Sequence, residues 1–187
     1  MVSGANGGAT EFEDISSAAN GTFNNNGGAA SGAFGGRTAF FGSSTAANGT
    51  FINNGGAISG GSGGGTIFFD SSTAGDATFT ANAAAVSGAR AGLIVFYGSS
   101  PAGAGTFVVN GAMVGGTSAG YCSLYEDADG GTVRFEFFDG GELNISGHNP
   151  PGITTGSAYP AAPVARLPKS APERLRFPAL VHMPGQQ

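Results

Sequence analysis

The chain has 187 residues, enough for one ordinary domain or one solenoid, and 36 of them are glycine. Glycine costs about 1 kcal/mol per helical position relative to alanine, so this composition disfavours helices, whereas 15 phenylalanines supply apolar surface that disordered low-complexity chains lack. The formal net charge is −5, with only seven Lys and Arg, which argues against a nucleic-acid partner, because phosphates require clustered basic side chains.

The dominant pattern in the sequence is a repeat with a period of 28 residues. Its copies are 38–46, 66–74 and 94–102, with an earlier copy that begins near Thr10 and a shortened one that begins at Cys122. Such a repeat can bury its apolar residues only against neighbouring repeats, so residues one period apart should stack. We therefore expect residues 1–149 to form an all-β, right-handed parallel β-helix, a solenoid of about five coils.

Three apolar rows emerge when the copies are aligned. They are Phe12, Phe40, Phe68, Phe96 and Leu124; Phe23, Phe51, Phe79 and Phe107; and Ala30, Ile58, Val86 and Val114. Glycine and polar turn residues separate the rows. This arrangement predicts three short strands per coil and a roughly triangular cross-section.

A row of asparagines falls where the second predicted strand of each coil must turn. Its members are Asn26, Asn54, Asn82 and Asn110. Asparagine tolerates turn backbone, and stacked side-chain amides can hydrogen-bond to one another along the axis of the solenoid. We therefore expect an asparagine ladder along one corner.

Strand alternation places the residues on either side of the Phe40 row on the outside of the solenoid. The outward residues are Glu13, Phe41, Phe69, Tyr97 and Tyr125, flanked by Ala39, Ile67 and Val95. Soluble monomers seldom leave a contiguous apolar stripe of this size bare. The sequence thus predicts an interaction face made of Phe41, Phe69, Tyr97, Tyr125, Ile67 and Val95, covered either by a second copy of the chain or by the C-terminal tail.

The acidic residues do not form the paired carboxylates of a polysaccharide hydrolase or lyase. Asp70 and Glu126 share a coil position but are separated by Gly98 in the coil between them. Only Glu126, Asp127 and Asp129 cluster, in the shortened coil, where we expect a solvated loop, with a weak cation site as the less favoured alternative.

Two segments match Gly-x-Ser-x-Gly, the pattern around the nucleophile of α/β-hydrolases, at 60–64 and 116–120. No helix is expected to follow either of them, and the two histidines, His148 and His182, fall in a terminal turn and in the tail. The row Thr22, Thr50, Thr78 and Thr106 lacks the second threonine row of an ice-binding surface. We predict no enzyme activity, no catalytic or metal-ligating residues, and no cofactor.

A single cysteine, Cys122, excludes an internal disulfide framework and a cysteine-based metal cluster. No run approaches the roughly 20 apolar residues of a membrane-spanning helix, so no membrane insertion is expected. The first residues also lack the basic and apolar regions of a signal peptide.

Residues 150–187 break the repeat and are rich in proline, which disfavours the interiors of strands and helices. This segment holds four of the seven basic residues: Arg166, Lys169, Arg174 and Arg176. We expect a basic tail that packs on the solenoid or caps the open edge of its last coil.

The repeat units, with Ser43–Ala46 followed by Asn53–Gly56, and the segments 130–136 and 141–152 resemble the repeat region of bacterial autotransporter-like β-helix passenger proteins. The resemblance covers roughly residues 10–155. It implies an extracellular or surface-displayed rod, in families whose passengers often act as stalks or adhesins.

We therefore expect a non-enzymatic structural or interaction module that forms homo-oligomers through its outer aromatic residues, with a glycan or another cell-surface molecule as a further partner. The alternative is a carbohydrate-binding or carbohydrate-degrading β-helix that uses Tyr97 and Tyr125 as a stacking platform.

Overall fold

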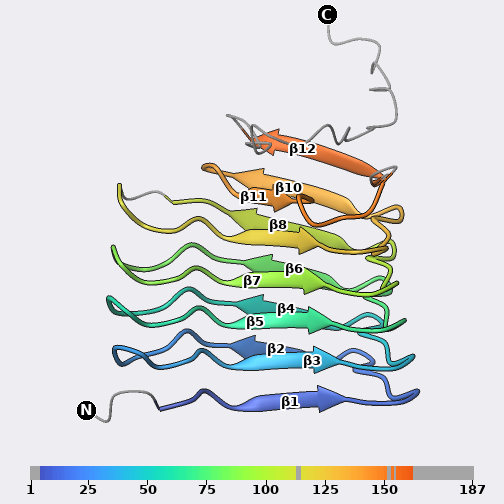
Figure 1. The fold of residues 1–187 in the computed structure, drawn as a ribbon, viewed down its shortest axis with the longest axis horizontal. Coiled ribbons are helices and arrows are strands. Elements are labelled where there is room, and N and C mark those ends of the chain that lie inside the picture. The colour runs from blue at the N-terminus through green and yellow to red at the C-terminus, as the bar shows by residue number, and fades with distance from the viewer. Residues whose placement is uncertain (1–4, 113–114, 151–152, 154, 162–187) are drawn as a thin grey trace, which may run out of the picture.

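The computed structural model describes residues 5–112, 115–150, 153 and 155–161. Its strands alternate between two six-stranded parallel sheets, here called the front sheet and the rear sheet (Figure 1). The front sheet consists of β1 (Ala9–Phe12), β3 (Arg37–Phe40), β5 (Gly65–Phe68), β7 (Leu93–Phe96), β9 (Tyr121–Leu124) and β11 (Glu142–Asn144). The rear sheet consists of β2 (Thr22–Asn25), β4 (Thr50–Asn53), β6 (Thr78–Ala81), β8 (Thr106–Asn110), β10 (Arg134–Phe138) and β12 (Ser157–Ala161).

Residues one period apart pair with each other throughout the central coils. Thr38 pairs with Thr66 and Thr66 with Ile94, both in parallel, and Phe51 pairs with Phe79 in the rear sheet. The chain runs rightward along the front and leftward along the back as it rises, which makes the solenoid right-handed (Figure 1). The predicted all-β solenoid with a 28-residue period is confirmed, and no described residue is helical, so none of them belongs to a membrane-spanning helix.

The shortened coil predicted at Cys122 is also present. Tyr121 of β9 pairs with Leu93, 28 residues earlier, whereas Glu142 of β11 pairs with Tyr121, and 142 − 121 is 21. The chain passes from β10 to β11 through Gly140 and Gly141, without the long loop that joins the rear sheet to the front sheet in earlier coils.

Two stacks of phenylalanine rings fill the space between the sheets. Phe40 lies 4.7 Å from Phe12 and 4.8 Å from Phe68 between ring centroids, with interplanar angles of 7°. The second stack contains Phe51, whose ring meets Phe40 edge-on at 5.7 Å. Such aromatic pairs add about 0.5–1.5 kcal/mol each beyond the burial of their area. The two predicted phenylalanine rows are therefore the core.

The third predicted apolar row does not point inward, and the structure has two sheets rather than three. Ile58 is only half-buried, Val86 is 38% exposed, and Val114 lies outside the described residues. The reason is local: Ile58 and Val86 each begin a tight turn, in which their carbonyls accept hydrogen bonds from Gly61 and Ala89, at 3.0 and 3.3 Å. Strand alternation does not apply in such a turn.

The third side of the cross-section lies at the opposite end of the coil, between each front strand and the rear strand that follows it. Isolated parallel bridges join Ser17 to Thr45 and Thr45 to Thr73. The adjoining buried row contains Ala18, Ala46, Ala74 and Ala102. Each of these alanines is at most 7% exposed, so this row belongs to the core.

The predicted asparagine ladder is present at the base of each long loop. Asn54 donates to Asn26 at 3.0 Å, Asn82 to Asn54 at 2.8 Å, and Asn110 to Asn82 at 2.8 Å, each through Nδ2 and Oδ1. The backbone N–H of Gly64 donates to the carbonyl of Asn54 at 2.8 Å and closes the loop. A Cβ on Gly64 would collide with the carbonyl of Asn25, which explains why this position is glycine.

Most of the expected tail, 162–187, lies outside the described residues. Its described part contributes β12, which pairs in parallel with β10 and brings Pro160 opposite Phe137. The expectation that proline would keep this segment out of a strand is wrong. Proline is tolerated because β12 is the edge of the rear sheet, where one side of the strand has no neighbour to receive an N–H.

Candidate interaction face

The outward aromatic residues form a continuous stack, here called the outer aromatic stack: Phe41, Phe69, Tyr97 and Tyr125. The ring centroids are 4.9, 5.4 and 5.1 Å apart in that order, and the interplanar angles are 2°, 10° and 10°. Each side chain is half-buried, because its neighbours cover its faces. The stack therefore presents ring edges to the outside, not ring faces.

Beside the stack runs a second outward row, here called the central row: Ala39, Ile67 and Val95. Ala39 is 1% exposed, Val95 is 6% exposed, and Ile67 is half-buried. The six residues predicted as an interaction face thus lie together on the front sheet. They are less exposed than expected, since the most exposed large apolar side chains described are elsewhere, at Ile15 (87%) and Phe34 (62%).

On the other side of the central row, the front sheet is hollowed into a groove of about 560 Å³. Its lining includes Arg37, Gly65, Ile67, Arg90, Leu93 and Tyr121. Gly65 occupies the outward position between Arg37 and Leu93 in adjacent strands, and it is buried because the side chain of Leu93 lies over it. The sequence did not reveal this groove, because strand alternation says which side chains point outward but not where they leave space between them.

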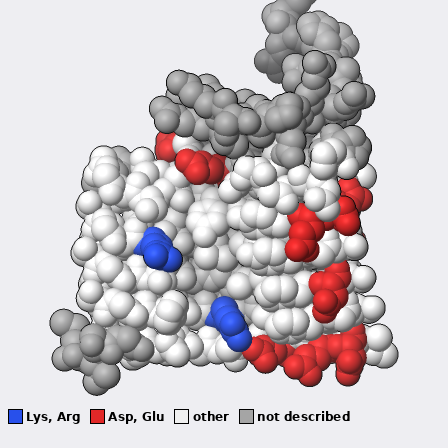
Figure 2. Space-filling model, viewed as in Figure 1, with Lys and Arg blue, Asp and Glu red and all other residues white. Residues whose placement is uncertain are grey.

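Charge is divided across the same face. Figure 2 shows basic side chains toward its left and centre, and acidic side chains along its right-hand and lower edges and in a further group near the top. Arg37 pairs with Glu11 at 2.8 Å, and both side chains are exposed. Arg90 is exposed beside the groove.

The acidic edge has a structural basis in one row of left-handed residues. The row is Asp14, Gly42, Asp70, Gly98 and Glu126, with φ between 55° and 69°. Asp70 accepts a hydrogen bond from the N–H of Gly42 at 3.0 Å, and Glu126 accepts one from Gly98 at 2.6 Å. Alternation with glycine keeps the carboxylates two coils apart, and Asp70 and Glu126 each accept a hydrogen bond from the coil below.

The three clustered acids of the shortened coil also have separate partners. Asp127 accepts from Asn149 at 2.9 Å, and Asp129 accepts from the N–H of Gly131 at 3.1 Å, while Glu126 holds Gly98. No group of three His, Cys, Asp or Glu within the described ranges could hold a metal ion. The solvated loop is thus the arrangement that these contacts favour.

Within the described ranges, no hydrogen bond joins either Gly-x-Ser-x-Gly segment to a histidine. Ser118 Oγ donates to the carbonyl of Ala89 at 3.1 Å. The ring of His148 is held by the carbonyls of Asn149 and Ala128, at 2.6 and 2.8 Å. His182 lies outside the part of the chain that the structure describes.

Two tyrosines on this face, Tyr97 and Tyr121, favour the neutral form. Burial raises the pKa of Tyr97, and the neighbouring Tyr125 and Glu126 raise it further. Burial also raises the pKa of Tyr121, with Arg90 opposing the shift. Their hydroxyls are therefore hydrogen-bond donors at neutral pH.

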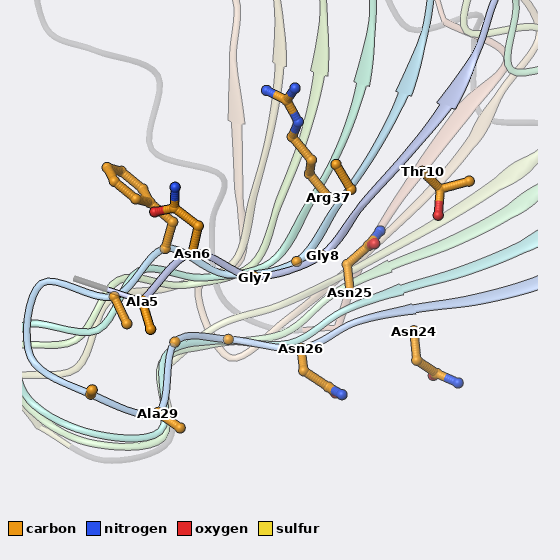
Figure 3. A pocket seen from close by; sticks show the side chains of 17 residues that line it. Ala5, Asn6, Gly7, Gly8, Thr10, Asn24, Asn25, Asn26, Ala29 and Arg37 are labelled. Carbon is orange, nitrogen blue, oxygen red and sulfur yellow. The ribbon is translucent and has the colours of Figure 1, made fainter. Parts of the chain in front are cut away.

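A second hollow of about 550 Å³ lies at the N-terminal end of the solenoid. Figure 3 shows Asn25 directed between the two sheets, toward the strand that carries Thr10, whereas Asn24 and Asn26 point away. This hollow is lined by residues of the first coil and by the start of the next one, at the N-terminal end of the solenoid. It carries no cluster of titratable groups, because its lining is mainly glycine, alanine and asparagine.

Comparison of the chain with family models, with curated proteins and with solved structures returns no match. The fold therefore rests on the strand pairing described above, and the function must be argued from the front face.

Proposed function

We propose that this chain is a non-enzymatic structural or interaction module, a stalk-like or adhesin-like rod of a secreted or surface protein, which self-associates through its outer aromatic stack. The observation that carries the proposal is the ladder of Phe41, Phe69, Tyr97 and Tyr125 on a flat sheet. The resemblance of the repeats to autotransporter-like passengers supports the extracellular or cell-surface location.

The geometry of the stack favours protein association over carbohydrate stacking. A sugar ring packs on the exposed face of an aromatic ring, but here Tyr97 has Phe69 on one face and Tyr125 on the other, 5.4 and 5.1 Å away. The exposed edges suit packing against apolar side chains, and the tyrosine hydroxyls suit hydrogen bonds to a partner's backbone.

Light scattering on the full chain tests the proposal. We expect a mass above that of the monomer at about 100 µM, and a monomer for Phe69→Asp, because a carboxylate in the stack cannot be desolvated without a partner. Phe138→Asp is the matched control, since Phe138 is 37% exposed on the rear sheet. Circular dichroism establishes that both variants fold. A monomeric wild-type protein, or an unchanged mass for Phe69→Asp, contradicts the proposal.

A further inference from the structure

We propose that two copies of this chain pair front face to front face around a two-fold axis parallel to the solenoid axis, so that the outer aromatic stack of each copy lies along the groove of the other. The inference rests on the proposed self-association and specifies its partner surface and its orientation. It goes beyond the predicted face, because it assigns a role to the groove and to the two arginines beside it.

The symmetry follows from the order of the outward rows on the front sheet. The central row, represented by Ile67, has Gly65 on one side and Phe69 on the other, each two residues away along the chain. A two-fold axis over the central row exchanges these two sides and preserves the height along the solenoid. Gly65 of one copy then faces Phe69 of the other, and the central row faces itself.

The two sides are complementary in shape. On one side, the groove of about 560 Å³ is bounded by side chains that include Arg37, Arg90 and Leu93. On the other side, Phe69 belongs to a continuous ridge of ring edges stacked between Phe41 and Tyr97. When the ridge of one copy lies in the groove of the other, the ring edges and the groove lining are both removed from water. The core of a protein–protein interface is desolvated in this way.

Charge selects the parallel orientation. Arg90 is exposed at the groove side, where Arg37 is paired with Glu11, and Asp70 and Glu126 lie just beyond the aromatic side. The parallel two-fold axis brings Arg90 opposite the partner's acidic row. An axis along the strands, which would pair the copies in antiparallel fashion, places the acidic row of one copy opposite the acidic row of the other, an arrangement that electrostatic repulsion disfavours.

Cysteine cross-linking of the full chain tests the position of the axis. Ile67→Cys places a thiol next to its own symmetry mate, so we expect a covalent dimer on mild oxidation. Ile52→Cys is the matched control, because Ile52 is also a half-buried outward isoleucine, but on the rear strand β4. The native Cys122 is fully buried and does not contribute a reactive thiol.

Charge reversal tests the orientation. Arg90→Glu should weaken the dimer by at least about tenfold in sedimentation equilibrium, because it sets like charges against each other. Arg134→Glu on the rear sheet serves as the control and should leave the dimer unchanged.

The outcomes separate this inference from the proposed function. Cross-linking through residue 67 and not 52, together with a weaker Arg90→Glu dimer, supports the inference. If the wild-type chain is a dimer but the Ile52→Cys variant cross-links, or neither cysteine variant cross-links, the inference is overturned and self-association stands. A dimer that is equally strong in the Arg90→Glu variant overturns the inference in the same way. A wild-type chain that remains a monomer at about 100 µM overturns both.

Discussion

Asn25 and Asn53 lie one above the other inside the solenoid, and Nδ2 of Asn25 donates a 2.8 Å hydrogen bond to Oδ1 of Asn53. The hydroxyl of Thr38 donates to Oδ1 of Asn25 at 3.1 Å, and that of Thr66 donates to Oδ1 of Asn53 at 2.9 Å. The ladder ends there because the next residue of the row is Ala81, which leaves Nδ2 of Asn53 without a partner among the described residues. This inward row of the rear sheet thus changes from asparagine in the first two coils to apolar residues above them, beside the phenylalanine stacks.

Asn53→Ala should destabilise the fold by about 1–3 kcal/mol, since it removes the buried Oδ1 that accepts hydrogen bonds from Asn25 Nδ2 and from the Thr66 hydroxyl. The free energy of unfolding from urea titration measures this. Asn54→Ala is the control, because Asn54 belongs to the partly exposed outer ladder, and its loss should cost less. Equal losses for the two variants would contradict the structural role of the inner ladder.

Phe68→Ala should cost about 3–5 kcal/mol, because it leaves a cavity in the centre of the core. Phe68 is fully buried and stacks on Phe40 at 4.8 Å and on Phe96 at 4.6 Å. Val86→Ala should change stability by less than about 0.5 kcal/mol, since Val86 is in the exposed turn. Urea denaturation of both variants compares the two rows directly. A large loss of unfolding free energy for Val86→Ala would show that the Val86 row is part of the core.

The contrast between Phe68 and Val86 shows what periodicity can and cannot predict. Both residues belong to rows with a period of 28, and the repeat correctly predicted that Phe68 stacks on Phe96 in the next coil. It could not say which way a side chain points, because that depends on whether the local backbone is a strand or a turn. Asn25 and Asn53 were missed for another reason: their row contains only two asparagines before Ala81, so no ladder was apparent.

The outer face was predicted better than the groove beside it. Strand alternation places Phe69 and Ile67 outward correctly, since both follow from the inward Phe68. The groove is lined by residues of neighbouring strands, such as Gly65 and Leu93, and by loop residues whose path the sequence does not specify. That Arg37 and Arg90 both line this groove also requires the three-dimensional coil.

Asp70→Ala should destabilise the fold by about 1–3 kcal/mol, because it combines two losses. The carboxylate no longer accepts the hydrogen bond from Gly42, and alanine is strained at the φ of 58° found at Asp70. Asp70→Asn keeps an acceptor oxygen and tolerates this backbone, so it should cost less than Asp70→Ala. Thermal unfolding of the two variants measures this. If the two variants lost the same stability, the charge of Asp70 and not its hydrogen bond would be what stabilises the fold.

Stability should fall as the pH rises above about 10. The folded state holds the pKa of Tyr97 and Tyr121 above the ordinary value of 10.0, so both remain protonated while the unfolded chain loses these protons. The unfolded state is thereby favoured, and below the ordinary pKa these groups contribute no pH dependence. Urea titrations at pH 8 and pH 11 test this, with Tyr97→Phe/Tyr121→Phe as the control that should show a smaller loss.

The central claim is that residues 28 apart lie directly beside each other in adjacent coils. Thr50 and Thr78 are Cα partners on the outside of the rear sheet, as are Thr78 and Thr106. Adjacent parallel strands are about 4.8 Å apart, within the range that a disulfide can bridge. The double variant Thr50→Cys/Thr78→Cys should therefore form an intramolecular disulfide on oxidation, and Thr50→Cys/Thr106→Cys, two coils apart, should not. Peptide mapping that finds no 50–78 disulfide, or finds 50–106 instead, would contradict the stacking on which the fold and the front face depend.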